Sequence, residues 1–132
     1  MTASHDGSMV SENTAAEFLA VVSEKTTFCL GHYKPYLRKD FNMEQLSVIT
    51  QIPLAVLQYY FSLSGLSFDS LINEWRVCHA KNIMHIESSN KLELHTIAML
   101  SGFATLKKFI ETFVALEGIS PEIYQSQINE PK

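Results

Sequence analysis

Two adjacent lysines, Lys107 and Lys108, are the side chains whose position most clearly suggests a chemical role. They follow Thr105 and open a stretch in which Phe109 and Phe113 recur at helical spacing. The first turn of a helix carries unpaired N–H groups and the positive end of the helix dipole, so ammonium groups there can bind a phosphate together with the backbone. The pattern indicates a helix terminus suited to phosphate.

Other chemistries have little support in the sequence. Cys29 and His32 have two residues between them, but no second pair at ligand spacing accompanies them, and a structural zinc ion needs four ligands. Because no nucleophile motif, acid pair or glycine-rich phosphate loop is recognisable, we expect no enzyme, cofactor or metal site. Cys29 and Cys78 could form one disulfide, but we expect two reduced, buried thiols.

The composition limits which classes of protein this chain can belong to. The 132 residues are 46% hydrophobic and 18% charged, which is typical of a soluble globular chain. No signal peptide is visible and no apolar run approaches the roughly 18 residues of a membrane span, so we expect a cytoplasmic protein without membrane contact. The net charge of −4 is unusual for a nucleic-acid-binding domain, whose Lys and Arg residues displace counterions from phosphates. Binding to DNA would therefore depend on how the few basic residues are arranged.

The elements around the two lysines are predicted from turn and cap signals. A helix near 93–100 leads to a turn at 101–103, and a second helix follows from Thr105 to Leu116. Gly118 ends that helix, and Ser120-Pro121 begins a short final one.

The middle of the chain has the same order of signals. Asn42 and Gln45 form a predicted capping box before a helix that ends near Pro53. A second helix is expected from Pro53 to Leu63, with Gly65 as its C-terminal cap. Ser67 is the expected N-cap of a long helix that closes at 88–90.

The N-terminal region is predicted to be simpler. Residues 1–13 lack periodicity and are expected to be disordered, and a helix with Phe18 and Val22 on one face is expected from Thr14 to a stop at Gly31. Lys34-Pro35-Tyr36 is expected to form an extended turn. Residues 14–40 then constitute an accessory helix and linker.

The two halves repeat each other. Leu46 corresponds to Ile97, Ile52 to Phe103, Leu57 to Phe109, Phe61 to Phe113, Gly65 to Gly118 and Ser67 to Ser120, at separations of 51 to 53 residues. With no strand-like alternation anywhere, the sequence predicts an all-α protein. We expect two helix-turn-helix units joined by the long helix, plus the N-terminal accessory helix.

These motifs resemble the AraC-type (AraC/XylS) transcription regulators. The resemblance covers residues 41–126 and leaves 127–132 as a tail. It is carried by Ile97-Ala98-x-x-x-Gly102-Phe103, by the spaced Phe109 and Phe113, by Gly118-x-Ser120-Pro121, by Gly65-Leu66-Ser67-Phe68 and by Arg76-Val77-x-x-Ala80. Lys34-Pro35-Tyr36 and Phe68…Ile72-Asn73…Arg76 also resemble the Bacteroidetes variant of the family.

The resemblance implies a bacterial DNA-binding domain that places two recognition helices, 53–63 and 105–116, in successive major grooves of double-stranded DNA. It implies that Gln58 reads adenine and that Tyr59 contacts a thymine methyl or a phosphate. The implied DNA-facing residues are Leu54, Ala55, Gln58, Tyr59, Ser62, Thr105, Leu106, Lys107, Lys108 and Glu111.

Some residues depart from the family pattern. The helix 53–63 has no basic residue, Glu111 stands where Arg is common, and Val114 replaces a usual Lys. An alternative is therefore a degenerate member that keeps the fold and acts through protein contacts. The family also implies a sensory portion outside this chain or RNA polymerase as further partners, and leaves the oligomeric state open.

Overall fold

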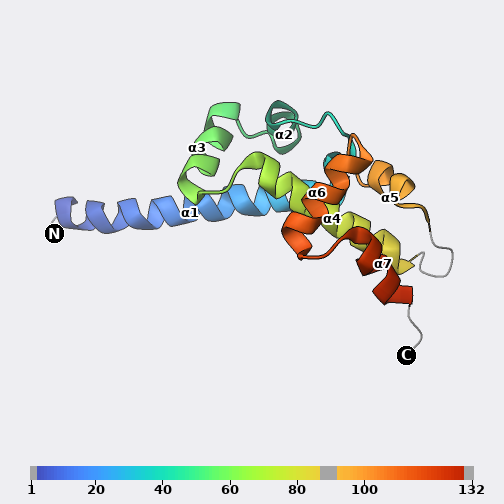
Figure 1. The fold of residues 1–132 in the computed structure, drawn as a ribbon. Coiled ribbons are helices and arrows are strands. Elements are labelled where there is room, and N and C mark those ends of the chain that lie inside the picture. The colour runs from blue at the N-terminus through green and yellow to red at the C-terminus, as the bar shows by residue number, and fades with distance from the viewer. Residues whose placement is uncertain (1–2, 87–91, 130–132) are drawn as a thin grey trace. The chain divides into compact units, whose positions relative to one another are not determined.

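The computed structural model describes the backbone of residues 3–86 and 92–129 and the side chains of residues 14–86 and 92–128. Within these ranges all regular structure is helical, as predicted, and no strand occurs. No described helix is by itself long and apolar enough to cross a membrane; α2 and α3 meet that test only when taken together across a sharp bend. The elements are α1 (Ala3–Tyr33), the 3-10 helix η1 (Pro35–Leu37), α2 (Met43–Thr50), α3 (Leu54–Ser64), α4 (Phe68–Ile86), α5 (Leu94–Leu100), α6 (Leu106–Glu117) and α7 (Pro121–Asn129) (Figure 1).

The helices group into two compact units. Unit 1 consists of residues 1–34 and 42–67, which contain α1, α2 and α3. Unit 2 consists of residues 35–41 and 68–132, which contain η1 and α4 to α7. Helix α1 contacts both α2 and α3 and belongs to unit 1.

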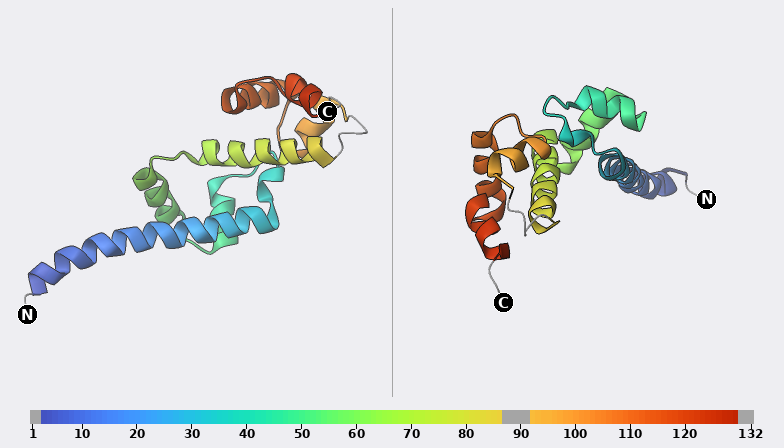
Figure 2. Two further views of the ribbon diagram at one scale, coloured as in Figure 1. Left: turned by 90° about the horizontal axis from the view of Figure 1, so that it is seen from below. Right: turned by 90° about the vertical axis from the view of Figure 1, so that its right-hand side faces the viewer.

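The core of unit 1 lies between α1 and the α2–α3 pair. Val22, Cys29 and Leu30 are buried on α1 at helical spacing, and Leu46 of α2 and Leu57 of α3, the two helices that α1 contacts, are fully buried. Figure 2 shows α2 and α3 beside the C-terminal half of α1, with the N-terminal half extending past them. The backbone of α1 is helical from Ala3, so the helix begins earlier in the chain than the predicted start.

The end of α1 differs from the prediction. The helix continues through Gly31 to Tyr33, and Lys34 then adopts a left-handed backbone with φ of +53°. The N–H of Lys34 donates to the carbonyl oxygen of Leu30 at 3.0 Å, which closes the last turn. Pro35 excludes the right-handed α conformation at Lys34, but the chain takes the left-handed region and a 3-10 turn instead of the expected extended one.

The caps of unit 1 follow the prediction. Asn42 Oδ1 accepts the Gln45 N–H at 2.9 Å and Gln45 Oε1 accepts the Asn42 N–H at 3.2 Å, which confirms the capping box. Gly65 ends α3 with φ of +75°, as expected for a glycine cap. Between the two helices Gln51 takes φ of +60°, Pro53 occupies the N-cap of α3, and α2 and α3 meet at 111°.

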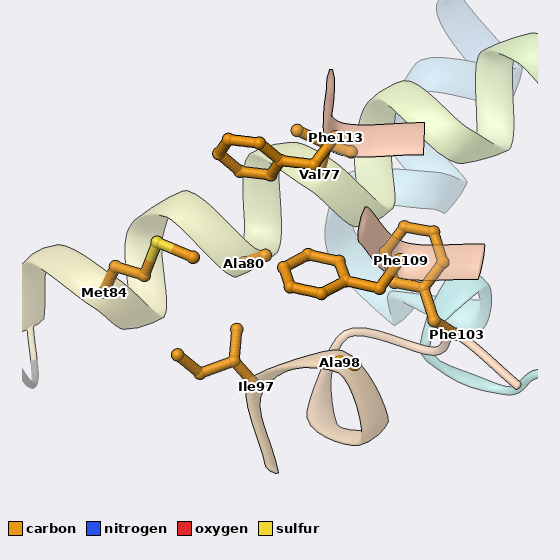
Figure 3. Close-up of a cluster of buried hydrophobic side chains, with 8 residues drawn as sticks. All are labelled: Val77, Ala80, Met84, Ile97, Ala98, Phe103, Phe109 and Phe113. Atoms are coloured by element: carbon orange, nitrogen blue, oxygen red, sulfur yellow. The ribbon is translucent and has the colours of Figure 1, made fainter. Parts of the chain in front are cut away.

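The core of unit 2 forms where α4 meets α5 and α6 (Figure 3). Eight buried residues, three from α4, two from α5 and three aromatics from the turn and α6, fill it. Lys81 Nζ lies 2.9 Å from Glu117 Oε1 and ties α4 to α6; this hydrogen bond raises the pKa of Lys81. Cys78 is exposed and unpaired, so only Cys29 fits the expected buried thiol. The eight core residues are Val77, Ala80, Met84, Ile97, Ala98, Phe103, Phe109 and Phe113.

The turn and cap signals of unit 2 are also confirmed. Gly102 in the turn before α6 has φ of +93°, and Gly118 ends α6 with φ of +80°. Pro121 is the first residue of α7, and Ser120 Oγ accepts the Ile123 N–H at 3.1 Å, which makes Ser120 the N-cap. The predicted close of α4 at 88–90 lies outside the described residues.

The residues paired by the sequence repeat share their burial and backbone conformation. Both members of each apolar pair are buried, and the two cap glycines both have positive φ. Gln51 and Gly102 correspond as well, because each is the left-handed residue of the turn. The buried pairs are Leu46 and Ile97, Ile52 and Phe103, Leu57 and Phe109, and Phe61 and Phe113.

Candidate nucleic-acid interface

The N-terminus of α6 presents the two lysines as the sequence predicts. Thr105 is the N-cap, and its Oγ1 accepts the Lys108 N–H at 3.1 Å. Lys107 and Lys108 are exposed in the first turn, and no described acid lies within ion-pair distance of either ammonium group. Both charges are therefore available to an anion at the positive end of the helix dipole.

Leu106 and Glu111, two other α6 residues that are predicted to face DNA, differ in how far they are exposed. Leu106 is half-buried and packs against the core of unit 2, so only part of its side chain is accessible. Glu111 is exposed and lines a shallow pocket of about 300 Å³ with Lys108 and with Asn73 of α4. The carboxylate of Glu111 thus lies on the accessible side of α6, where it opposes phosphate binding.

Helix α3 presents an uncharged face. Ala55, Gln58, Tyr59 and Ser62 are exposed, as predicted for outward positions, while Leu54 is half-buried. No Lys, Arg, Asp or Glu occurs between Leu54 and Ser64. Any recognition by this face depends on hydrogen bonds and apolar contacts rather than on charge.

Tyr59 has a neighbour that the sequence does not indicate. Its ring centroid lies 5.7 Å from that of Phe18 on α1, with the planes tilted by 47°. Tyr59 nevertheless remains 58% exposed, so one side of the ring contacts α1 and the rest is open to solvent. The pair is separated by about forty positions along the chain, and only the packing of α1 on α3 brings it together.

Two further basic residues border the turn before α6. A pocket of about 400 Å³ is lined by Arg38 and Lys39 on one side and by Met99, Gly102 and Phe103 on the other. Arg38 pairs with Asp40 at 3.5 Å in an exposed position. The sequence places Arg38 and Lys39 in a linker and offers no signal that they lie beside this turn.

Arg76 of α4 holds that loop in place. Its Nε donates to the carbonyl oxygen of Tyr36 at 2.8 Å and its Nη2 donates to that of Arg38 at 2.9 Å. Burial lowers the pKa of the guanidinium, and Asp69 acts in the opposite direction. Arg76 therefore joins α4 to η1.

Charge is distributed unequally between the units. Eight of the ten Lys and Arg residues belong to unit 2, and unit 1 contains only Lys25 and Lys34. Unit 1 carries five acids, namely Asp6, Glu12, Glu17, Glu24 and Glu44. Unit 2 carries the other nine acids, so its net charge is −1 against −3 for unit 1, and attraction to a polyanion depends on where its basic residues lie.

The described residues include no cluster of three His, Cys, Asp or Glu side chains able to hold a metal ion. Cys29 is buried with its Sγ 3.9 Å from the carbonyl oxygen of Ile49, whereas His32 is exposed and its ring stacks on that of Phe28. The two residues of the Cys29–His32 pair thus have separate surroundings.

No family model, curated protein or solved structure matches this chain.

Proposed function

We propose that the chain is the DNA-binding domain of a bacterial transcription regulator of the AraC type. In this proposal α2–α3 and α5–α6 act as helix-turn-helix units joined by α4, and α3 and α6 read successive major grooves about 34 Å apart. The observation that carries the proposal is the N-terminus of α6, where a capped first turn presents Lys107 and Lys108 without an acidic partner among the described residues.

Further geometry supports the proposal. The angle of 111° between α2 and α3 lies in the range of about 90–120° that is typical of helix-turn-helix pairs. The burial of both members of each repeated apolar pair supports the assignment of α5–α6 as a second unit of the same kind. Lys39 adds positive charge beside the turn of the second pair, where Arg38 is paired with Asp40.

A second candidate function is a protein-interaction module with the same fold. The uncharged exposed face of α3 and the acidic composition of unit 1 favour it. Tyr59 and Leu63, which are one helical turn apart, are 58% and 47% exposed and would suit a protein partner. The two candidates differ in one property, the affinity for duplex DNA.

Selection from a random duplex library at low salt distinguishes them. The DNA proposal predicts enrichment of a motif with two half-sites about one helical turn apart. If the folded protein enriches no motif, the DNA proposal is wrong and the interaction module is favoured. A Lys107→Ala, Lys108→Ala double variant serves as the negative control, since the proposal predicts that it loses most binding to every sequence.

A further inference from the structure

The contact between Phe18 and Tyr59 links α1 to the exposed face of α3. Phe18 is half-buried and lies one helical turn before Val22, which is buried in the core of unit 1. Its ring therefore sits on a side of α1 that is fixed by core packing. Tyr59 contacts this ring at 5.7 Å and keeps more than half of its surface open.

A fixed aromatic ring matters on this helix because α3 has no charge. Without Lys or Arg, discrimination among base pairs by α3 rests on short-range contacts, which are lost when a side chain changes rotamer. A ring packed against α1 loses less conformational freedom on binding than a ring free in solvent. The contact with Phe18 thus prepares Tyr59 for a contact that demands a defined position.

We infer that Phe18 is a positioning residue that orients Tyr59 to contact the 5-methyl group of a thymine. This inference rests on the proposed function. We assign a thymine methyl rather than a phosphate for two reasons. Apolar contact with a methyl group requires a ring held in a defined position. Phosphate binding is favoured by a nearby cation, and α3 has no Lys or Arg beside the Tyr59 phenol. Phe18 itself is not required to touch DNA.

The experiment uses the motif selected by the wild-type chain. Replacing thymine by deoxyuracil at the contacted position removes only the methyl group, and wild-type affinity is expected to fall about fourfold, the effect of one buried methyl-sized group. Phe18→Leu and Tyr59→Ala are each expected to bind the thymine and uracil sites equally. Phe18→Tyr keeps an aromatic ring at residue 18 and is expected to restore the fourfold difference.

Phe28→Leu is the matched control, because it makes the same substitution on an exposed position of α1, where the ring stacks on His32. It is expected to keep the wild-type ratio. Thermal unfolding is recorded for each variant, and the ring-proton shifts of Tyr59 in DNA-free protein are compared between Phe18→Leu and Phe28→Leu, with a change expected in Phe18→Leu alone.

Two results overturn the inference about Phe18, and they show whether the proposed function fails with it. If wild-type enriches no motif, the proposed function and the inference both fail. If wild-type selects a motif but Phe18→Leu retains the fourfold ratio, or weakens binding equally at all positions, only the inference fails.

Discussion

The backbone of Gly102 lies against the carbonyl oxygen of Tyr36 so closely that a Cβ atom at residue 102 would overlap that oxygen. The same oxygen accepts a hydrogen bond from Arg76 Nε. The turn before α6, the segment after α1 and the long helix α4 therefore meet at one carbonyl group. This junction sets the position of α6 within unit 2.

Gly102→Ala is expected to destabilise the protein by about 3 kcal/mol or more, since it adds steric overlap to an unfavourable positive φ. Gly118→Ala is the matched control. It has a similar positive φ of +80° but no atom within 4 Å of the added Cβ, so a loss of only about 1 kcal/mol is expected. Urea unfolding measures both, and equal losses would show that residue 102 has room for a side chain.

Thr26→Val is expected to stabilise unit 1. The Thr26 side chain is buried at 2% exposure, and its Oγ1 has no hydrogen-bond partner among the described residues, so the nearly isosteric valine removes a desolvated hydroxyl worth about 1 kcal/mol. Thr50→Val should have the opposite effect. Thr50 is equally buried, but its Oγ1 donates to the Leu46 carbonyl oxygen at 2.8 Å and accepts the Ile52 N–H. A lower melting temperature for Thr26→Val would contradict the inference that the buried Thr26 hydroxyl destabilises unit 1.

Arg76→Met is expected to cost about 2 kcal/mol, because two carbonyl oxygens lose a charged donor. Arg38→Met removes the same type of side chain from an exposed pair with Asp40, and should change stability by less than about 1 kcal/mol. Denaturant midpoints of the two variants test the comparison. Similar midpoints would argue against a structural role for Arg76.

The local signals in the sequence predict much of this fold. The capping box of Asn42 and Gln45, the glycine caps at 65 and 118, and the Ser120 N-cap depend only on near neighbours, so their residue types are sufficient. The turn at Gln51 has the same left-handed backbone as that at Gly102 but no glycine to indicate it.

Features that depend on tertiary packing could not be predicted in this way. The grouping of α1 with α2 and α3, the half-burial of Leu106 and the contact of Phe18 with Tyr59 depend on which helices pack together. Periodicity identifies an apolar face without naming its partner. For the same reason, nothing in the sequence indicates that Arg38 and Lys39 lie beside the turn before α6.

Glu111→Lys is expected to raise affinity for random duplex DNA several-fold at low salt, because it replaces a repulsive carboxylate beside Lys108 with an attractive ammonium group. Glu24→Lys makes the same charge change on an exposed position of α1 and should have a smaller effect. Fluorescence anisotropy with a labelled random duplex measures both. If Glu111→Lys gives no greater increase than Glu24→Lys, residue 111 does not face DNA.

The salt dependence of DNA binding tests the central claim most directly. Each phosphate contact contributes about 0.9 to the slope of log affinity against log salt, so Lys107→Ala should lower the slope by about 1 and weaken binding to every sequence. Gln58→Ala should leave the slope unchanged and relax preference at one base pair, and Lys25→Ala, an exposed lysine of α1, should change neither. If Lys107→Ala and Lys25→Ala give the same slope as wild-type, the N-terminus of α6 does not bind the DNA backbone.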